Sequence, residues 1–66
     1  MNVPQLRKPT RADAVNCARV LRETLHELVS NEARDLGAVV ERYRAGAPLT
    51  ASRLERARAA CQRVLC

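Results

Sequence analysis

The sequence predicts an all-α protein: an antiparallel helical hairpin, with a long first helix and a shorter second one, that assembles as a dimeric helical bundle. Apolar residues recur at steps of three or four along most of the chain, which is the spacing of amphipathic helices. Only one aromatic residue, Tyr43, is present, whereas sheets favour aromatic and β-branched side chains. A chain of 66 residues has a marginal core of its own, so we expect a second copy to add to it.

Residues 1–9 are expected to form a flexible basic tail, followed by a helical hairpin domain at 10–66. The tail contains two prolines, has no apolar periodicity and carries Arg7 and Lys8, and we expect no strand in it. No stretch has the apolar length of a signal peptide or a membrane span. We therefore expect a cytoplasmic protein with reduced cysteines and no membrane contact.

The first helix is expected over residues 10–44. Thr10 can cap its first amides, and Asp13, three residues later, can complete a capping box. A continuous helix of this length would measure about 52 Å, which is long for a globular protein. The pair Ser30-Asn31 could instead cap a new helix and give three helices of ordinary length. The continuous helix is favoured, because no Gly or Pro accompanies that pair and the apolar stripe continues in phase.

Residues 45–50 are expected to form the corner between the helices. Gly46 can adopt the left-handed conformation that ends helices, and Pro48 prevents the helix from continuing. A DNA-binding helix-turn-helix is the alternative, but it has a tighter turn and usually offers Asn or Gln for base contacts. The corner of a hairpin is therefore favoured over a DNA-reading turn.

The second helix is expected over residues 51–65. Thr50 can act as its N-cap, and the flanking Leu49 and Leu54 have the spacing of a hydrophobic staple. Folding this helix back against the first brings two apolar faces together. The predicted hairpin core consists of Leu36, Val40, Tyr43, Leu54, Ala57, Cys61 and Leu65.

The second helix is too short to cover the beginning of a 35-residue first helix, so part of the apolar stripe is expected to remain open. A homodimer core of the four-helix type is the favoured use of this stripe, and docking of a different protein is the alternative. The predicted dimer or partner interface consists of Ala14, Ala18, Leu21, Leu25, Leu28 and Val29.

Charged side chains near the stripe allow two interpretations. Glu32 lies within the stripe of the first helix and Arg58 at the edge of the second, so the two could form an ion pair that fixes the register. The favoured interpretation is that Glu32 extends into solvent. A further set shares the outer face of the second helix and could contact an acidic partner or phosphates, or be only solvated: Arg53, Arg56 and Arg63.

No motif for catalysis, metal binding or cofactor binding is present. His26 is the only histidine, and a zincin helix would need a second one where Ser30 stands. Cys61 is expected in the core. Cys17 is expected about 24 Å away along the first helix, too far for a disulfide within one chain. Cys66 is expected to be exposed. We therefore expect no enzyme, no metal and no cofactor.

Two functions follow as hypotheses. The first is a small protein-interaction module, such as a regulator, an inhibitor or a chaperone-type adaptor, that binds a larger protein as a homodimer through an amphipathic helix. The alternative is a small dimeric nucleic-acid-binding regulator, comparable to helical plasmid copy-number regulators, that uses the basic face of the second helix. Without aromatic platforms it would bind duplexes at the backbone, with strong salt dependence.

The layout of residues 25–65 combines an Arg/Gly corner with an Ala-rich second helix. This layout is similar to that of the small co-chaperones of type III secretion needle subunits. The resemblance covers the layout and no specific motif. It implies binding to another small secretion protein, which is a subclass of the first hypothesis.

Overall fold

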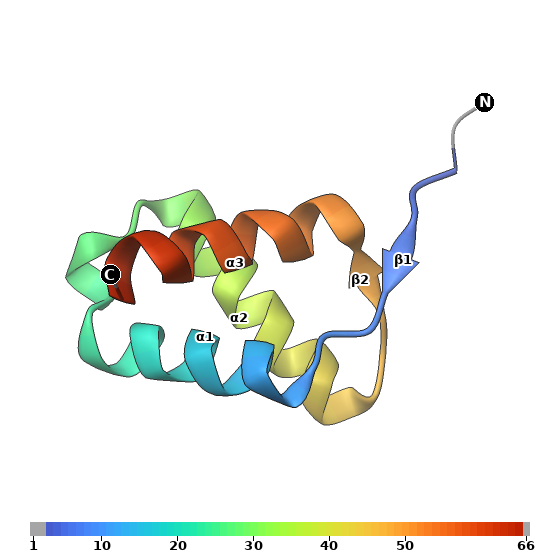
Figure 1. The fold of residues 1–66 in the computed structure, drawn as a ribbon, viewed down its shortest axis with the longest axis horizontal. Coiled ribbons are helices and arrows are strands. Elements are labelled where there is room, and N and C mark those ends of the chain that lie inside the picture. Colours follow the sequence, from blue (N-terminus) through green and yellow to red (C-terminus); the bar gives the residue numbers. More distant parts are fainter. Residues whose placement is uncertain (1–2, 66) are drawn as a thin grey trace.

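The computed structural model describes residues 3–65 and shows three helices with a small β-ribbon (Figure 1). The chain is mostly helical, as the sequence predicts. None of its described helices is both long enough and apolar enough to cross a membrane. In chain order the elements are β1 (Leu6–Arg7), α1 (Arg11–Glu23), the 3-10 helix η1 (Leu25–Glu27), α2 (Ser30–Ala45), β2 (Leu49–Thr50) and α3 (Ala51–Leu65).

Helix α1 begins and ends where side chains satisfy the free backbone groups. The Asp13 amide donates to Thr10 Oγ1 at 3.1 Å and the Thr10 amide donates to the Asp13 carboxylate at 2.9 Å, which confirms the capping box. At the other end, Thr24 donates from its amide and from its hydroxyl to the carbonyl of Val20. The Thr24 backbone (φ −136°, ψ 32°) has left the helical region, so α1 ends there.

The continuous helix predicted over residues 10–44 is wrong, because the chain leaves the α-helical conformation between α1 and α2. Val29 is extended (φ −80°, ψ 162°), and its amide donates to the Glu32 carboxylate at 3.1 Å, which caps α2. The alternative of a new helix near Ser30-Asn31 matches the structure, although the capping side chain is Glu32. The break lets α1 turn back and pack against the other two helices.

Helices α1 and α3 run in the same direction, and α2 runs in the opposite direction. Residues at nearly the same offset meet between α1 and α3, since Asp13 pairs with Arg58, 45 positions later, and Cys17 lies against Cys61, 44 positions later. Figure 1 shows both helices running from the ribbon end of the molecule toward the end where the C-terminus lies. The predicted antiparallel hairpin therefore survives only in α2 and α3, within a three-helix bundle.

The strands β1 and β2 form an antiparallel pair, Leu6 with Thr50 and Arg7 with Leu49. The Ala51 amide extends this pairing by donating to the Gln5 carbonyl at 2.8 Å. The expectation of no strand is wrong here. Since α1 and α3 begin side by side, the extended segments that precede them meet, and two residues are too few to show a strand pattern in the sequence.

The corner between α2 and α3 has the predicted form. Gly46 adopts the left-handed conformation (φ 65°), and the Arg53 amide donates to Thr50 Oγ1 at 3.3 Å, so the predicted N-cap is confirmed. Leu49 and Leu54, at the two staple positions, are both buried. This corner fixes where α3 starts and so where its arginines lie.

A single core lies between the three helices and the ribbon. Its buried side chains come from all three helices and from β2, and several of them are completely inaccessible to solvent. The packing of α1 onto this core uses apolar surface that a long helix would have left open. The buried cluster consists of Cys17, Val20, Leu36, Val39, Leu49, Leu54, Ala57, Ala60 and Cys61.

Candidate functional site

Four of the residues predicted for the hairpin core are buried. These are Leu36, Leu54, Ala57 and Cys61. Val40 is half-buried and packs against the same cluster. The other two predicted core residues, Tyr43 and Leu65, are 40% and 42% exposed and lie outside the buried cluster.

The predicted dimer or partner interface is divided by the fold. Ala14 is buried and Ala18 half-buried within the bundle, and Leu21 and Leu28 are half-buried against the core. Leu25 and Val29 remain 53% and 64% exposed. One chain thus covers most of the stripe that the sequence assigns to a second copy. The homodimer stays a prediction. The large uncovered apolar stripe on which it was based is not present in the residues that the structure describes.

The three arginines predicted for an acidic partner or for phosphates all pair with carboxylates of α2. Arg53 and Arg56 share Asp35: the Nε atoms of the two arginines lie 3.3 Å and 3.1 Å from its two carboxylate oxygens. Arg63 pairs with the Glu32 carboxylate, and it also donates to the Glu27 carbonyl at 3.3 Å. The predicted face is therefore split between two ends of α3.

The ion pair considered between Glu32 and Arg58 does not form, and each residue has another partner. Arg58 makes a two-pronged contact with the Asp13 carboxylate, with both N to O distances 2.8 Å. The hydrogen bonds from Arg58 lower the pKa of Asp13 to about 2. For Glu32, the Val29 amide and then Arg63 lower the pKa below its usual value. Arg58 pairs with Asp13 because α1 lies beside α3, and Glu32 pairs with Arg63 between α2 and α3.

A concave surface lies where the ribbon meets the end of α2 and the start of α3. It has a volume of about 420 Å³ and combines three arginines with apolar side chains. We call it the basic hollow, and its lining consists of Leu6, Arg42, Pro48, Leu49, Thr50, Arg53 and Arg56. Sequence reasoning found Arg53 and Arg56 but not Leu6 or Arg42. Leu6 is brought beside the corner by a ribbon that has no signal in the sequence, and Arg42 lies near the end of α2, where its side chain reaches the Pro48 carbonyl.

The electrostatics of the basic hollow favour an anionic ligand. Asp35 is only 6% exposed and contacts Arg53 and Arg56 through their Nε atoms. Within residues 3–65, the terminal amino groups of these two guanidinium groups have no recorded hydrogen bond. Arg42 Nη1 donates to the Pro48 carbonyl at 3.3 Å, which holds this third guanidinium beside the corner. Three arginines against one carboxylate leave an excess of two positive charges.

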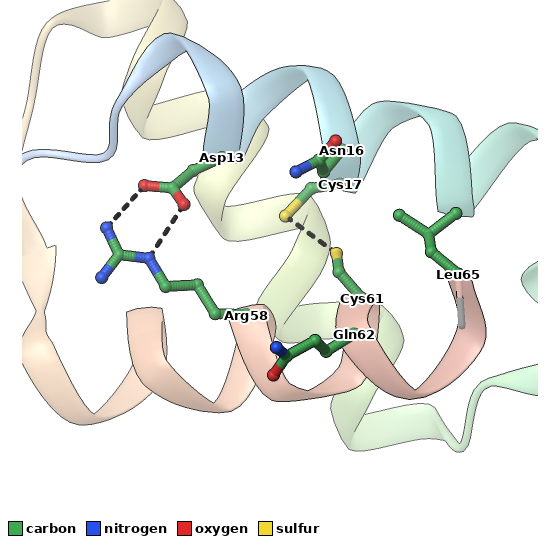
Figure 2. A pocket seen from close by; sticks show the side chains of 7 residues that line it. All are labelled: Asp13, Asn16, Cys17, Arg58, Cys61, Gln62 and Leu65. Carbon is green, nitrogen blue, oxygen red and sulfur yellow. Dashed lines mark hydrogen bonds and ion pairs between the residues drawn. The ribbon is translucent and has the colours of Figure 1, made fainter.

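A second concave surface lies between α1 and α3 and has a volume of about 390 Å³. Figure 2 shows the side chains of Cys17 and Cys61 pointing toward each other, with the Asp13–Arg58 pair beside them. The two sulfur atoms are 3.7 Å apart. The predicted separation of about 24 Å between these cysteines is wrong, because it assumed a continuous first helix. We call this surface the thiol hollow, and its lining consists of Asp13, Asn16, Cys17, Arg58, Cys61, Gln62 and Leu65.

The described residues offer little for acid–base or metal chemistry. The His26 side chain is 80% exposed, and its Nε2 atom lies 4.0 Å from the Glu27 carboxylate. In the part of the chain that the structure describes, no three His, Cys, Asp or Glu residues are grouped so that they could hold a metal ion. Cys66, expected to be exposed, lies outside the described residues.

Comparisons with protein-family models, with curated proteins and with solved structures found no match to this chain. The resemblance in layout to the secretion co-chaperones therefore gains no support from a matched relative. The functional argument depends on the two hollows and on the charges around them.

Proposed function

We propose that this protein is a small non-enzymatic interaction module whose basic hollow binds an acidic, partly apolar segment of a larger protein. The single observation that carries the proposal is the meeting of Arg42, Arg53 and Arg56 with apolar side chains in one concave surface of about 420 Å³. This proposal keeps the first hypothesis from the sequence, a protein-interaction module. The binding surface that we now propose is the basic hollow at the ribbon end, in place of the apolar stripe of the first helix.

The chemistry of the lining supports a protein segment as the ligand. Arginine and apolar side chains together are typical of the centres of protein–protein interfaces, where guanidinium groups pair with carboxylates. Leu6 is 60% exposed at the edge of the hollow, and Leu49 is buried beneath it. Docking of an apolar side chain on Leu6 and Pro48 would remove apolar surface from water, which is favourable.

Nucleic acid is the second candidate, and the net charge of +5 favours it. Phosphate binding requires unneutralised positive charge along a surface that follows the backbone. On α3, however, Arg53 and Arg56 share Asp35, and Arg63 pairs with Glu32 at the other end. Asp35 and Glu32 therefore interrupt the positive charge along α3, where a nucleic-acid backbone would need it to continue, so we rank this alternative second.

The proposal is tested by capture from nuclease-treated lysate of the source cells, with immobilised wild-type protein and two matched variants. Arg42→Gln removes a charge that lines the basic hollow, and Arg44→Gln removes one two residues along the same helix but outside the lining. Neither arginine has a carboxylate partner among the described residues, so both variants should keep the fold.

We expect one protein to be retained in stoichiometric amount by the wild type and by Arg44→Gln, and much less by Arg42→Gln. Raising the salt concentration from about 50 to 200 mM should weaken retention, because the contacts are between charges. Equal retention by the two variants would mean that the basic hollow is not the binding site. Material captured from untreated lysate but absent after nuclease treatment would instead favour the nucleic-acid alternative. A cytoplasmic location remains part of the proposal.

A further inference from the structure

Two thiols from distant parts of the sequence lie side by side in the thiol hollow. Cys17 on α1 and Cys61 on α3 are 44 positions apart, yet their sulfur atoms are 3.7 Å from each other and joined by a hydrogen bond. Both are free thiols, and they are only 2% and 5% exposed. Both residues line the same concave surface, so a small molecule bound in it lies close to the two thiols (Figure 2).

We propose that Cys17 and Cys61 are an oxidative modification site, at which a peroxide converts the two thiols into a reversible intrachain disulfide. The sulfur atoms must approach by only about 1.7 Å to reach the length of a disulfide bond. They belong to helices that run in the same direction, with the Asp13–Arg58 pair beside them to keep the register. The inference does not depend on the proposed binding partner.

The reaction with hydrogen peroxide proceeds in two steps. One thiol loses its proton and attacks a peroxide oxygen; the O–O bond breaks, and the products are a sulfenic acid and water. The second thiol then attacks the sulfenic sulfur, the S–S bond forms, and the hydroxyl leaves as a second water molecule. Two thiols and one peroxide thus give one disulfide and two waters. The protein loses two electrons, and the peroxide is reduced by them.

Cys61 is the better candidate for the first attack. Burial raises the pKa of both thiols, but the hydrogen bond with Cys17 partly offsets this effect at Cys61. Cys61 is also slightly more exposed than Cys17. Because only thiolates react and both pKa values are raised, the oxidation should be slow near neutral pH and accelerate as the pH rises.

The site is tested by treating the folded, reduced protein with hydrogen peroxide and measuring its intact mass and free thiols. A Cys66→Ser background leaves Cys17 and Cys61 as the only thiols. We expect a monomeric product that is lighter by two hydrogen atoms, has no free thiol and returns to the starting mass with dithiothreitol. Its Tm should rise by at least about 10 °C, since the bond closes a long loop.

Trypsin locates the bond in the wild-type protein without any substitution. Cleavage after arginine separates residues 12–19, which contain Cys17, from residues 59–63, which contain Cys61. The oxidised protein should yield these two peptides joined by a disulfide. Cys17→Ser and Cys61→Ser, each in the Cys66→Ser background, should instead gain oxygen or form covalent dimers.

Three results would overturn the proposal. The folded protein could gain oxygen atoms instead of losing two hydrogens, it could cross-link between chains, or it could keep both thiols under conditions that oxidise the urea-unfolded chain. The wild-type peptide map decides the question even where a serine variant fails to fold.

Discussion

Asp13 has two roles at one position, because its carboxylate caps α1 and binds Arg58 of α3. Asp13→Asn should lower the free energy of unfolding by about 1–2 kcal/mol, a figure reduced because Arg58 is 44% exposed and water screens the pair. Urea unfolding followed by circular dichroism measures the change. Glu23→Gln is the control: this residue pairs with Arg19 and Arg22 on the exposed face of α1, and its loss should change stability by less than about 0.5 kcal/mol.

The free energy of unfolding should depend on pH because of the same Asp13–Arg58 contact. The pKa of Asp13 is lowered in the folded protein from 3.8 to about 2, so the unfolded chain binds its proton at higher pH than the folded chain does. The stabilisation is therefore fully present above about pH 4 and lost as the pH falls toward 2. The difference in unfolding free energy between wild type and Asp13→Asn should shrink over that range. A difference that stays constant down to pH 2 would mean that the Arg58 contact contributes nothing.

The side-chain pairs between helices could not be predicted from the sequence. Thr10, Asp13 and Thr50 act within a few residues of their own positions, so their spacing alone was sufficient to predict the caps. The partners of Arg58 and Arg63 depend on which helices lie side by side. One wrong helix boundary therefore hid the Asp13–Arg58 contact and gave a wrong expected distance between the cysteines.

At the scale of elements, two glycines of the α2 region should respond to alanine in opposite directions. Gly46 has φ 65°, where an alanine side chain is strained, so Gly46→Ala should lower stability by about 1–2 kcal/mol. Gly37 lies inside α2 with no atom within 4 Å of an added Cβ, so Gly37→Ala should raise stability by about 0.5–1 kcal/mol. Paired thermal and urea unfolding curves measure both changes. Destabilisation by Gly37→Ala would contradict the placement of α2.

The break between α1 and α2 was not predicted, because the sequence favours a continuous helix over residues 10–44. The apolar periodicity continues through residues 24–29, and neither glycine nor proline marks the end of a helix there. The physical causes are weak in the sequence: a threonine that bonds back to Val20, and Glu32 bonded to an extended Val29. The break is favoured by the free energy gained when α1 packs against the core. A local sequence pattern contains no information about that packing.

At the scale of the molecule, one chain buries a continuous core made by all three helices. Folding should then not require a second copy, and Tm should stay constant over a roughly 100-fold range of protein concentration. Differential scanning calorimetry with sedimentation equilibrium measures both stability and mass. A Tm that rises with concentration would support the homodimer predicted from the stripe, with the exposed Leu25 and Val29 as its first candidate contacts.

The candidate site was only half predictable from the sequence. Two arginines of the basic hollow lie on α3 and were identified by their shared helical face. Leu6 enters the hollow because the β-ribbon brings the N-terminal segment beside the corner, whereas Arg42 lies on α2 and reaches the corner by its hydrogen bond to the Pro48 carbonyl. A two-residue strand leaves no periodic signal, so only the three-dimensional structure brings these residues together.

The most direct test of the central claim is photo-crosslinking from two positions of similar exposure, in the presence of the protein captured from lysate. A photoreactive amino acid replaces Leu6, which is 60% exposed at the basic hollow, or Val15, which is 56% exposed on α1. We predict cross-links from position 6 to an acidic segment of the captured protein, and none from position 15. Cross-links from position 15 alone would contradict the proposal and identify the surface of α1 as the docking site.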